Sequence, residues 1–136
     1  MAEITFNRSI DIENTVRLAL NGFFTIYCRP MPKNFTLPCL EVQKVGGTDA
    51  NTIDTFDIVI DARADDEAAA DELLRNATGA LKEIAKIQNT PIRAVTVNSS
   101  GSWGSDPVRP DIAMCSARLR VVAHQEKVNI QEKVIQ

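Results

Sequence analysis

Apolar and polar side chains alternate over residues 55–62, which is the pattern of a half-buried β-strand. Phe56 and Ile58 fall on one side of an extended strand there. Asp57 and Asp61 fall on the other side. Such a strand has one face in a core and one face in water, so the chain must supply a second layer that covers the apolar face.

A long amphipathic helix follows this strand and can supply the second layer. Apolar residues recur at helical spacing from Ala70 to Ile84, and the pattern ends near Ile87. Asp65 or Asp66 is placed to cap the first turn. Acidic residues at a helix start are explained by the cap and the helix dipole, so we expect no metal site there.

The remaining apolar patterns predict one further helix and four further strands. We expect the helix over residues 10–21 and the strands over residues 23–28, 37–45, 92–98 and 115–123. Residues 99–107 are rich in Ser and Gly and show no period, which predicts a long connection between the last two strands. The predicted order is therefore αβββαββ.

This order predicts an α+β fold in which two helices pack on one face of a mostly antiparallel sheet. The length of 136 residues suits one core, so we expect a single-domain sandwich over residues 1–124. Residues 125–136 are too few and too mixed in character to form a core alone. They form either a frayed tail or an arm that docks on a neighbouring subunit through Val128, Ile130, Val134 and Ile135.

Charge and hydropathy exclude several classes of protein. The formal net charge is -3 and no basic block occurs, which argues against a dedicated nucleic-acid binder. No apolar run approaches the roughly 20 residues of a membrane-spanning helix. The first residues carry an acid and no apolar signal region, so we expect a cytosolic protein whose Cys28, Cys39 and Cys115 are reduced.

The residues that enzymes use are sparse in this chain. His124 is the single histidine, and its odd separation from Cys115 on one strand sends the two side chains to opposite faces. Asp57 and Asp61 share a face but stand roughly 13 Å apart at about 3.3 Å per residue, too far for a carboxylate pair. No nucleotide-binding glycine loop occurs. We therefore expect no enzyme, no cofactor and no metal.

The sequence instead offers candidate interaction residues. Asp57 and Asp61 can pair with Arg118 and Arg120 across the sheet, or with charges of another subunit. Trp103, the single tryptophan, lies in the predicted 99–107 connection and either folds back on the sheet or is offered to a partner. The candidate interface residues are Trp103, Asp57, Asp61, Arg118, Arg120, Val128 and Ile130.

Three stretches carry a family resemblance. They are residues 56–63 (FDIVIDAR), residues 66–74 (DEAAADELL) and residues 109–124 (RPDIAMCSARLRVVAH). Together with the early helix and the Pro-rich loop, they make the chain over residues 10–124 resemble the tail terminator proteins of long-tailed bacteriophages. The tail beyond His124 has no counterpart in that pattern.

The resemblance implies a structural protein of the virion, assembled in the host cytoplasm. Such a protein forms a homo-hexameric ring on the last ring of the tail tube protein, stops tube polymerisation and presents a surface to the head-tail connector. DNA would pass through the lumen without specific binding. From position alone, we expect the long helix and the strand of Arg118 and Arg120 to face neighbouring subunits. We expect residues 99–107 and the C-terminal segment to face the axial partners.

Three alternatives stay open. Neck and connector proteins of phages share much of the same pattern. A small ligand-binding or regulatory α+β module would hold its ligand between the helices and the sheet. A small enzyme would need a site completed at a subunit interface by His124 or Cys28.

Overall fold

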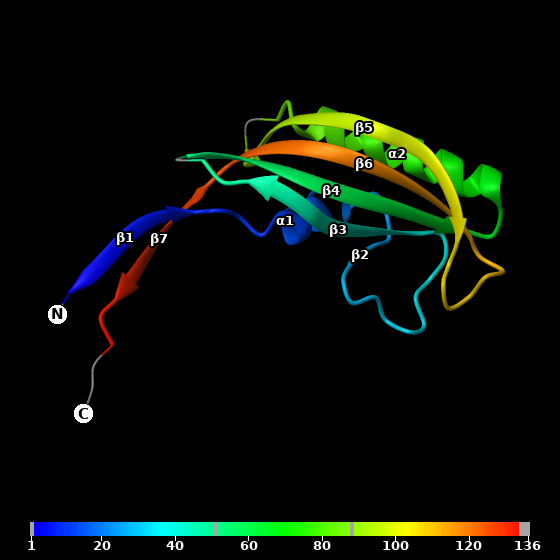
Figure 1. Ribbon diagram of the computed structural model, residues 1–136, viewed down its shortest axis with the longest axis horizontal. Coiled ribbons are helices and arrows are strands. Elements are labelled where there is room, and N and C mark those ends of the chain that lie inside the picture. The colour runs from blue at the N-terminus through cyan, green and yellow to red at the C-terminus, as the bar shows by residue number, and fades with distance from the viewer. Residues whose placement is uncertain (1, 51, 88, 134–136) are drawn as a thin grey trace.

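The computed structural model describes residues 2–50, 52–87 and 89–133. Two helices and seven strands follow one another along these residues (Figure 1). In chain order they are β1 (Glu3–Arg8), α1 (Ile12–Leu20), β2 (Ile26–Cys28), β3 (Cys39–Thr48), β4 (Ile53–Ala64), α2 (Glu67–Ile84), β5 (Ile92–Ser105), β6 (Ala113–His124) and β7 (Glu126–Gln131).

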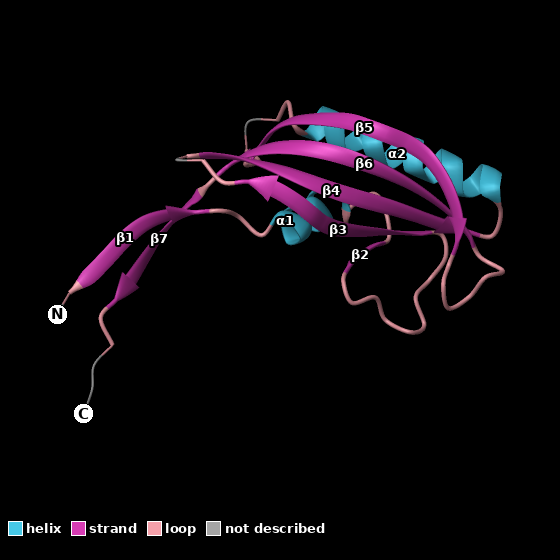
Figure 2. Cartoon of the chain, viewed as in Figure 1, coloured by secondary structure: helices cyan, strands magenta, loops and turns pink. Residues whose placement is uncertain are grey.

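Five of the strands form one sheet in the order β2-β3-β4-β6-β5. The β3–β4 and β5–β6 neighbours are antiparallel hairpins, β4 and β6 are also antiparallel, and only β2 runs parallel to its neighbour β3. Both helices lie behind this sheet (Figure 2). The predicted α+β class, with a mostly antiparallel sheet and two helices on one face, is confirmed.

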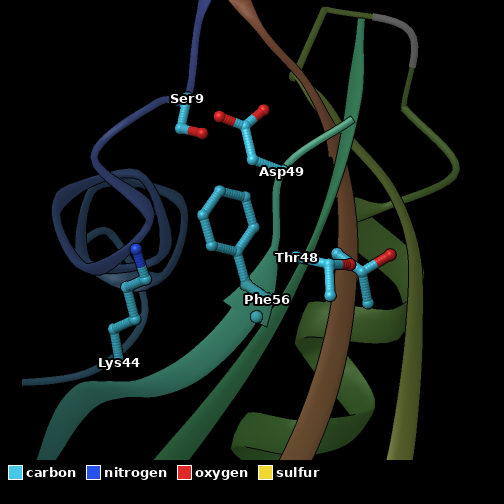
Figure 3. Close-up of a pocket in the computed structure, with 7 residues that line it drawn as sticks. Ser9, Lys44, Thr48, Asp49 and Phe56 are labelled. Atoms are coloured by element: carbon cyan, nitrogen blue, oxygen red, sulfur yellow. The ribbon is translucent and has the colours of Figure 1, made fainter. Parts of the chain in front are cut away.

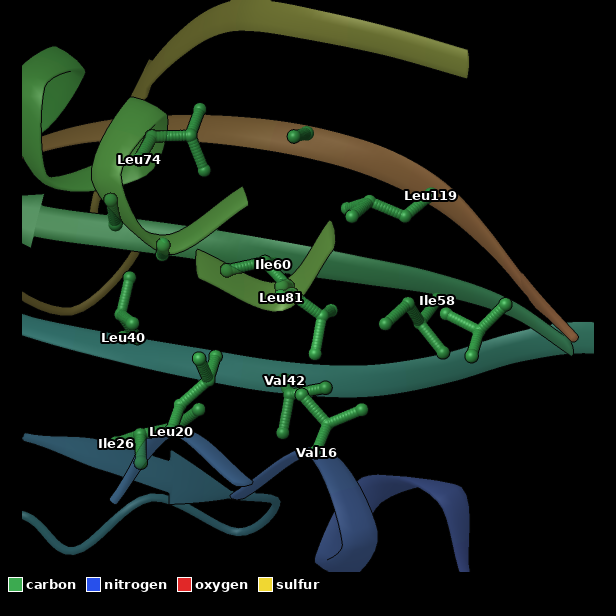
Figure 4. Close-up of a cluster of buried hydrophobic side chains, with 14 of the residues drawn as sticks. Val16, Leu20, Ile26, Leu40, Val42, Ile58, Ile60, Leu74, Leu81 and Leu119 are labelled. Atoms are coloured by element: carbon green, nitrogen blue, oxygen red, sulfur yellow. The ribbon is translucent and has the colours of Figure 1, made fainter. Parts of the chain in front are cut away.

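The core lies between the helices and the sheet (Figure 4). Ile58 and Ile60 of β4 and Leu119 of β6 are fully buried there, as the alternation predicts. Helix α2 contributes Leu74 and Leu81 to the same cluster. Burial of a side chain of this size stabilises the fold by roughly 1.5–3 kcal/mol. Packing of this kind, rather than intrinsic propensity, holds helices as short as α1.

Both helices begin at an aspartate cap. Asp11 accepts a hydrogen bond from the backbone N–H of Asn14 at 3.1 Å, and Asp66 accepts one from Ala69 at 2.7 Å. Asp66 is thus the cap of the long helix, which ends at Ile84, three residues before the predicted end. Each cap satisfies a backbone donor that the first turn leaves without a partner.

The predicted connection over residues 99–107 is wrong, because strand β5 extends through most of it. The strand continues through this Ser/Gly-rich segment as far as Ser105, paired with β6. Three register irregularities interrupt the ladder, and Gly101 adopts a positive φ of 82°. Bulges of this kind let a segment without apolar alternation remain in a sheet. The first predicted strand is also shorter than expected, because only Ile26–Cys28 pair with β3.

The first and last strands form a separate two-stranded ribbon, which we call the arm. Strand β1 pairs antiparallel with β7, from Glu3 opposite Gln131 to Arg8 opposite Glu126. The arm leaves one end of the sheet and points away from the body of the molecule (Figure 1). Residues 3–8, for which the sequence patterns predict no element, are therefore a strand, and the observed order begins and ends with a strand the prediction lacks. Val134 and Ile135 lie outside the described residues.

Candidate functional site

The open face is the side of the five-stranded sheet opposite the helices. Asp57 and Asp61 of β4 lie on it, because the neighbouring residues of the strand point into the core. Arg118 and Arg120 of β6 lie on it for the same reason, and both are exposed. Neither helix covers this face (Figure 2), but the β2–β3 and β5–β6 loops pack over its end at Arg63 through Phe35 and Asp106.

Only one of the expected charge pairs forms on the open face. Asp57 stands opposite Arg120 in the register, and Arg120 Nε lies 3.3 Å from Asp57 Oδ1. Asp61 instead accepts hydrogen bonds from Ser116 and Gln43. Among the described residues, no carboxylate lies within 4.0 Å of Arg118. Asp57, Arg118 and Arg120 are at least partly exposed, as expected, whereas Asp61 is only 6% exposed and is held by its hydrogen bonds within the sheet.

A buried ion-pair network at the end of this face was missed by the sequence analysis. Arg63 Nε donates to Asp106 Oδ2 at 2.7 Å, and its Nη1 donates to Glu41 Oε1 at 3.2 Å. All three side chains are buried. The ring of Phe35 lies 5.9 Å from the Arg63 guanidinium. The strand alternation places Arg63 on the face of Asp57 and Asp61, and this was the signal that could have found it.

The ionisation of this network follows from its burial. Desolvation raises the pKa of Glu41, and Arg63 offsets only part of that rise. Burial also acts to raise the pKa of Asp106, but hydrogen bonds from the backbone of Arg109 and from Arg63 outweigh it and lower the pKa. The same carboxylate accepts the backbone N–H of Val108. The network therefore ties the loop after β5 to the sheet, which is a structural task.

Trp103 lies in strand β5 and not in a loop. It stands opposite Cys115, whose side chain is fully buried on the helix side, so Trp103 projects toward that side at the sheet edge. About half of its side chain is exposed. The predicted position of Trp103 in a connecting loop is therefore wrong, and its role in partner binding stays a prediction.

The arm has one apolar and one polar face. Ile130 lies opposite Ile4 and Val128 opposite Phe6, all on the same side of the ribbon. Ile4 is 64% exposed and Ile130 52% exposed. On the other side, Asn129 donates a hydrogen bond to Thr5, and polar or charged side chains fill the remaining positions.

A joint around Asp54 attaches the arm to the body. Asp54, which is 1% exposed, accepts hydrogen bonds from Ser9 at the end of one arm strand and from Gln125 at the start of the other. It also accepts the backbone N–H of Ala50 in the β3–β4 turn. Burial acts to raise the pKa of Asp54, but the hydrogen bonds from Ser9 and Gln125 outweigh it and lower the pKa.

A small pocket borders the joint (Figure 3). Its volume is about 200 Å³, and Ser9, Asp49 and Phe56 line it. The Lys44 ammonium lies 5.3 Å from the centre of the Phe56 ring and forms another side. The lining comes from the arm base, from the β3–β4 hairpin and from the start of β4: Ser9, Lys44, Gly47, Thr48, Asp49, Thr55 and Phe56. The pocket is therefore the gap between the arm base and the β3–β4 hairpin.

The C-terminal ends of the two helices form an apolar hollow. Its volume is about 500 Å³. We define the apolar hollow by its apolar lining residues Leu18, Phe23, Ile84, Ile87 and Pro91. Phe23 is 75% exposed, and Leu18 is 60% exposed. Large apolar side chains that gather in water typically mark an interaction site. The sequence analysis placed Phe23 in a strand and so missed this surface.

The described residues offer little catalytic chemistry. No group of three or more His, Cys, Asp or Glu among them is placed to hold a metal ion. Burial raises the pKa of Cys28 and of Cys115, which opposes thiolate formation. Within the same residues, neither helix has the length and apolar character to cross a membrane.

Comparison with known proteins assigns no family. No protein-family model matches the chain, and no curated protein matches it. The inference about function therefore rests on the surfaces that the fold presents, together with the resemblance that the sequence carries.

Proposed function

We propose that this chain is a structural subunit of a long-tailed bacteriophage, a tail terminator that forms a hexameric ring on the end of the tail tube. The arm is the observation that carries the proposal. It exposes Ile4 and Ile130 to water on a ribbon that points away from its own domain. In an isolated chain this ribbon leaves apolar side chains in water. The arm therefore fits a protein that works by contact with other subunits.

The proposed mechanism is occlusion. A ring of six copies covers the last ring of tube protein and leaves no surface on which the next tube subunit can add. A ring closes when each copy uses one surface against a different surface of its neighbour. The exposed side of the ring is then available to the head-tail connector.

The charge of the chain suits a ring through which DNA passes without specific binding. Tight binding to DNA requires several Lys or Arg contacts to phosphates. The chain has a net charge of -3, and one exposed arginine of the open face, Arg120, already pairs with Asp57. A lumen lined by six such copies would hold the duplex weakly.

A small ligand-binding module fits the structure less well. Such a module would bind its ligand between the helices and the sheet. Fully buried side chains fill that layer, including Leu74, Leu81 and Ile58 (Figure 4). The apolar hollow lies at the helix ends instead, where it is open to solvent.

Tube assembly in the presence of the purified chain tests the proposal. Tail tube protein of the same virion is polymerised with and without the chain, and negative-stain images record tube length and tube ends. We expect short tubes that carry a ring at one end. Normal tubes without rings overturn the proposal. Rings that bind the connector protein but not the tube identify a neck protein instead.

An arm variant with a matched control sharpens this test. Ile4→Asp with Ile130→Asp places charge on the exposed apolar face of the arm and is expected to abolish ring formation. Val108→Asp alters a still more exposed apolar residue in the loop after β5, far from the arm, and is expected to preserve capping. Equal capping by both variants would remove the arm from the mechanism.

A further inference from the structure

We propose that the apolar face of the arm of one copy docks in the apolar hollow of the neighbouring copy. The inference deepens the proposed function, on which it rests for the number of copies, by naming the two surfaces that meet. The donor surface is formed by Ile4, Phe6, Val128 and Ile130. The acceptor surface is the hollow defined by Leu18, Phe23, Ile84, Ile87 and Pro91.

The arm requires a partner surface on physical grounds. A lone two-stranded ribbon is marginally stable in water, because it has only one layer of side chains. Phe6 and Val128 shield each other in part, whereas Ile4 and Ile130 near the tip remain more than half exposed. Burial of these isoleucines on a second surface would remove the largest apolar exposure of the ribbon.

The arm cannot reach the hollow of its own chain. Asp54 holds both strands at the base through Ser9 and Gln125, and the ribbon then extends away from the sheet (Figure 1). The hollow lies on the body, where the C-terminal ends of α1 and α2 meet. The surface that the arm contacts must therefore belong to another molecule.

Two apolar surfaces on one chain point to a second copy as the occupant. Repetition of a single heterologous contact buries both surfaces in every subunit, and no other protein is needed. The polar borders of the two surfaces are also compatible. Arg8 pairs with Glu126 beside the arm face, and Lys86 pairs with Glu83 beside the hollow, so each border carries one positive and one negative charge.

Addition of the arm to the sheet edge is the less favourable route. Strand β5 forms one edge of the sheet, but three register irregularities and the positive φ of Gly101 interrupt it. Bulges at an edge oppose pairing with a further strand. The opposite edge strand, β2, has only three residues. The arm is therefore expected to bind through side chains and not through backbone hydrogen bonds.

The size of the contact sets its strength. Six residues in each strand make the ribbon about 20 Å long, and two strands make it about 10 Å wide, so its face covers roughly 200 Å² in projection. A stable pair of proteins buries about 800 Å² on each partner. One arm contact is therefore too weak to hold a dimer in dilute solution. A closed ring on the tube repeats the contact and adds the surface of the tube.

Disulfide trapping in solution detects a contact of this strength. Two full-length chains with different mass tags, both in a Cys28→Ser background, carry Ile130→Cys on the arm and Ile87→Cys in the hollow. They are mixed at high concentration under mild oxidation, and non-reducing gels report the heterodimer. The matched control replaces Ile87→Cys by Val108→Cys, which lies on a more exposed residue outside the hollow.

We expect the 130–87 heterodimer to exceed the 130–108 product by roughly tenfold. Equal yields of the two overturn the proposed contact, as does a predominance of 130–130 homodimers, which would indicate symmetric arm pairing. A second pair, Ile4→Cys with Phe23→Cys, repeats the measurement from the other arm strand. The assay contains no tube protein, so a failed cross-link with normal tube capping overturns this contact and leaves the terminator proposal standing. Cross-links without tube capping would support this contact and overturn the terminator proposal.

Discussion

Replacement of the buried Arg63 by methionine should destabilise the chain far more than the same replacement of the exposed Arg120 on the same face. Arg63 is the single cation between two buried carboxylates, Glu41 and Asp106, at 3.2 and 2.7 Å. Methionine keeps an unbranched apolar stem, although a shorter one, and removes the charge and all of the donors of the side chain. Glu41 and Asp106 then lose the cation they share, and Glu41 still lies opposite the buried Asp61 in the sheet.

The structure sets the magnitude of the effect. Loss of one partner from a buried ion pair costs about 3–5 kcal/mol. Asp106 retains the backbone N–H groups of Val108 and Arg109 as donors, so most of the cost falls on Glu41. We therefore expect a loss of about 3 kcal/mol, from a total of about 5–15 kcal/mol for an ordinary domain.

Urea denaturation of three variants measures this cost. Arg120→Met is the matched control, because Arg120 pairs with Asp57 on the same face but is mostly exposed, and we expect a loss below about 1 kcal/mol. The double variant Arg63→Met with Glu41→Gln leaves one buried anion fewer. It should recover most of the stability that Arg63→Met loses. A loss from Arg63→Met no larger than that from Arg120→Met would show that the buried ion pairs of Arg63 add no more stability than an exposed pair.

The pH dependence gives an independent check with a defined sign. Burial raises the pKa of Glu41 above its ordinary value of 4.5, and Arg63 opposes that rise. A carboxyl with a raised pKa in the folded state contributes stability that is present below its unfolded pKa and lost as pH rises. Without Arg63 the pKa rises further. The deficit of Arg63→Met should therefore shrink as the pH falls from neutral toward 4.5, and an unchanged deficit would contradict this.

Other predictions concern the joint, two glycines and a cysteine. Asp54→Ala removes three hydrogen bonds at the arm base, so hydrogen exchange should accelerate in β1 and β7 while β4 and β6 stay protected. Uniform acceleration would show that Asp54 supports the whole fold. Gly47→Ala should cost about 2 kcal/mol or more in urea denaturation, because φ is 144° and the new Cβ would lie 2.4 Å from the Thr55 carbonyl oxygen. Gly79→Ala in α2, where nothing lies within 4 Å, should instead stabilise by about 0.5–1 kcal/mol, and a loss at Gly79 would contradict the helix argument. Burial raises the pKa of Cys39 to about 11, so this thiol should resist alkylation at neutral pH until the chain unfolds, as mass spectrometry can check.

The central part of the fold was predictable because its signals are local. Strand β4, helix α2 and strand β6 each carry a period that a short window of sequence reveals, and their core positions follow from that period. Ile58, Ile60 and Leu119 are buried where the alternation places them. The pairing of Asp57 with Arg120 is the one interaction of the candidate site that formed as the sequence allowed.

The parts that were not predicted depend on distant partners. Strand β1 carries only six residues, and the strand it pairs with lies more than a hundred residues away. The composition around Trp103 favours a turn, but pairing with β6 holds this segment in a strand. The Arg63 network joins three separate elements, so no window of sequence contains it. The apolar hollow likewise forms only when the ends of α1 and α2 meet.

The separation of the arm strands also explains how the arm can be specialised for contact. If β1 and β7 paired before the body folded, closing the loop of more than a hundred residues between them would cost entropy, and only one ribbon would offset it. Once the body folds, Ser9 and Gln125 are already held together at Asp54, and the arm forms with little further entropy cost. Its side chains contribute little to the core, because Ile4 and Ile130 remain in water. They are therefore free to be selected for a partner surface, and substitutions on this face should change association while the body folds as before.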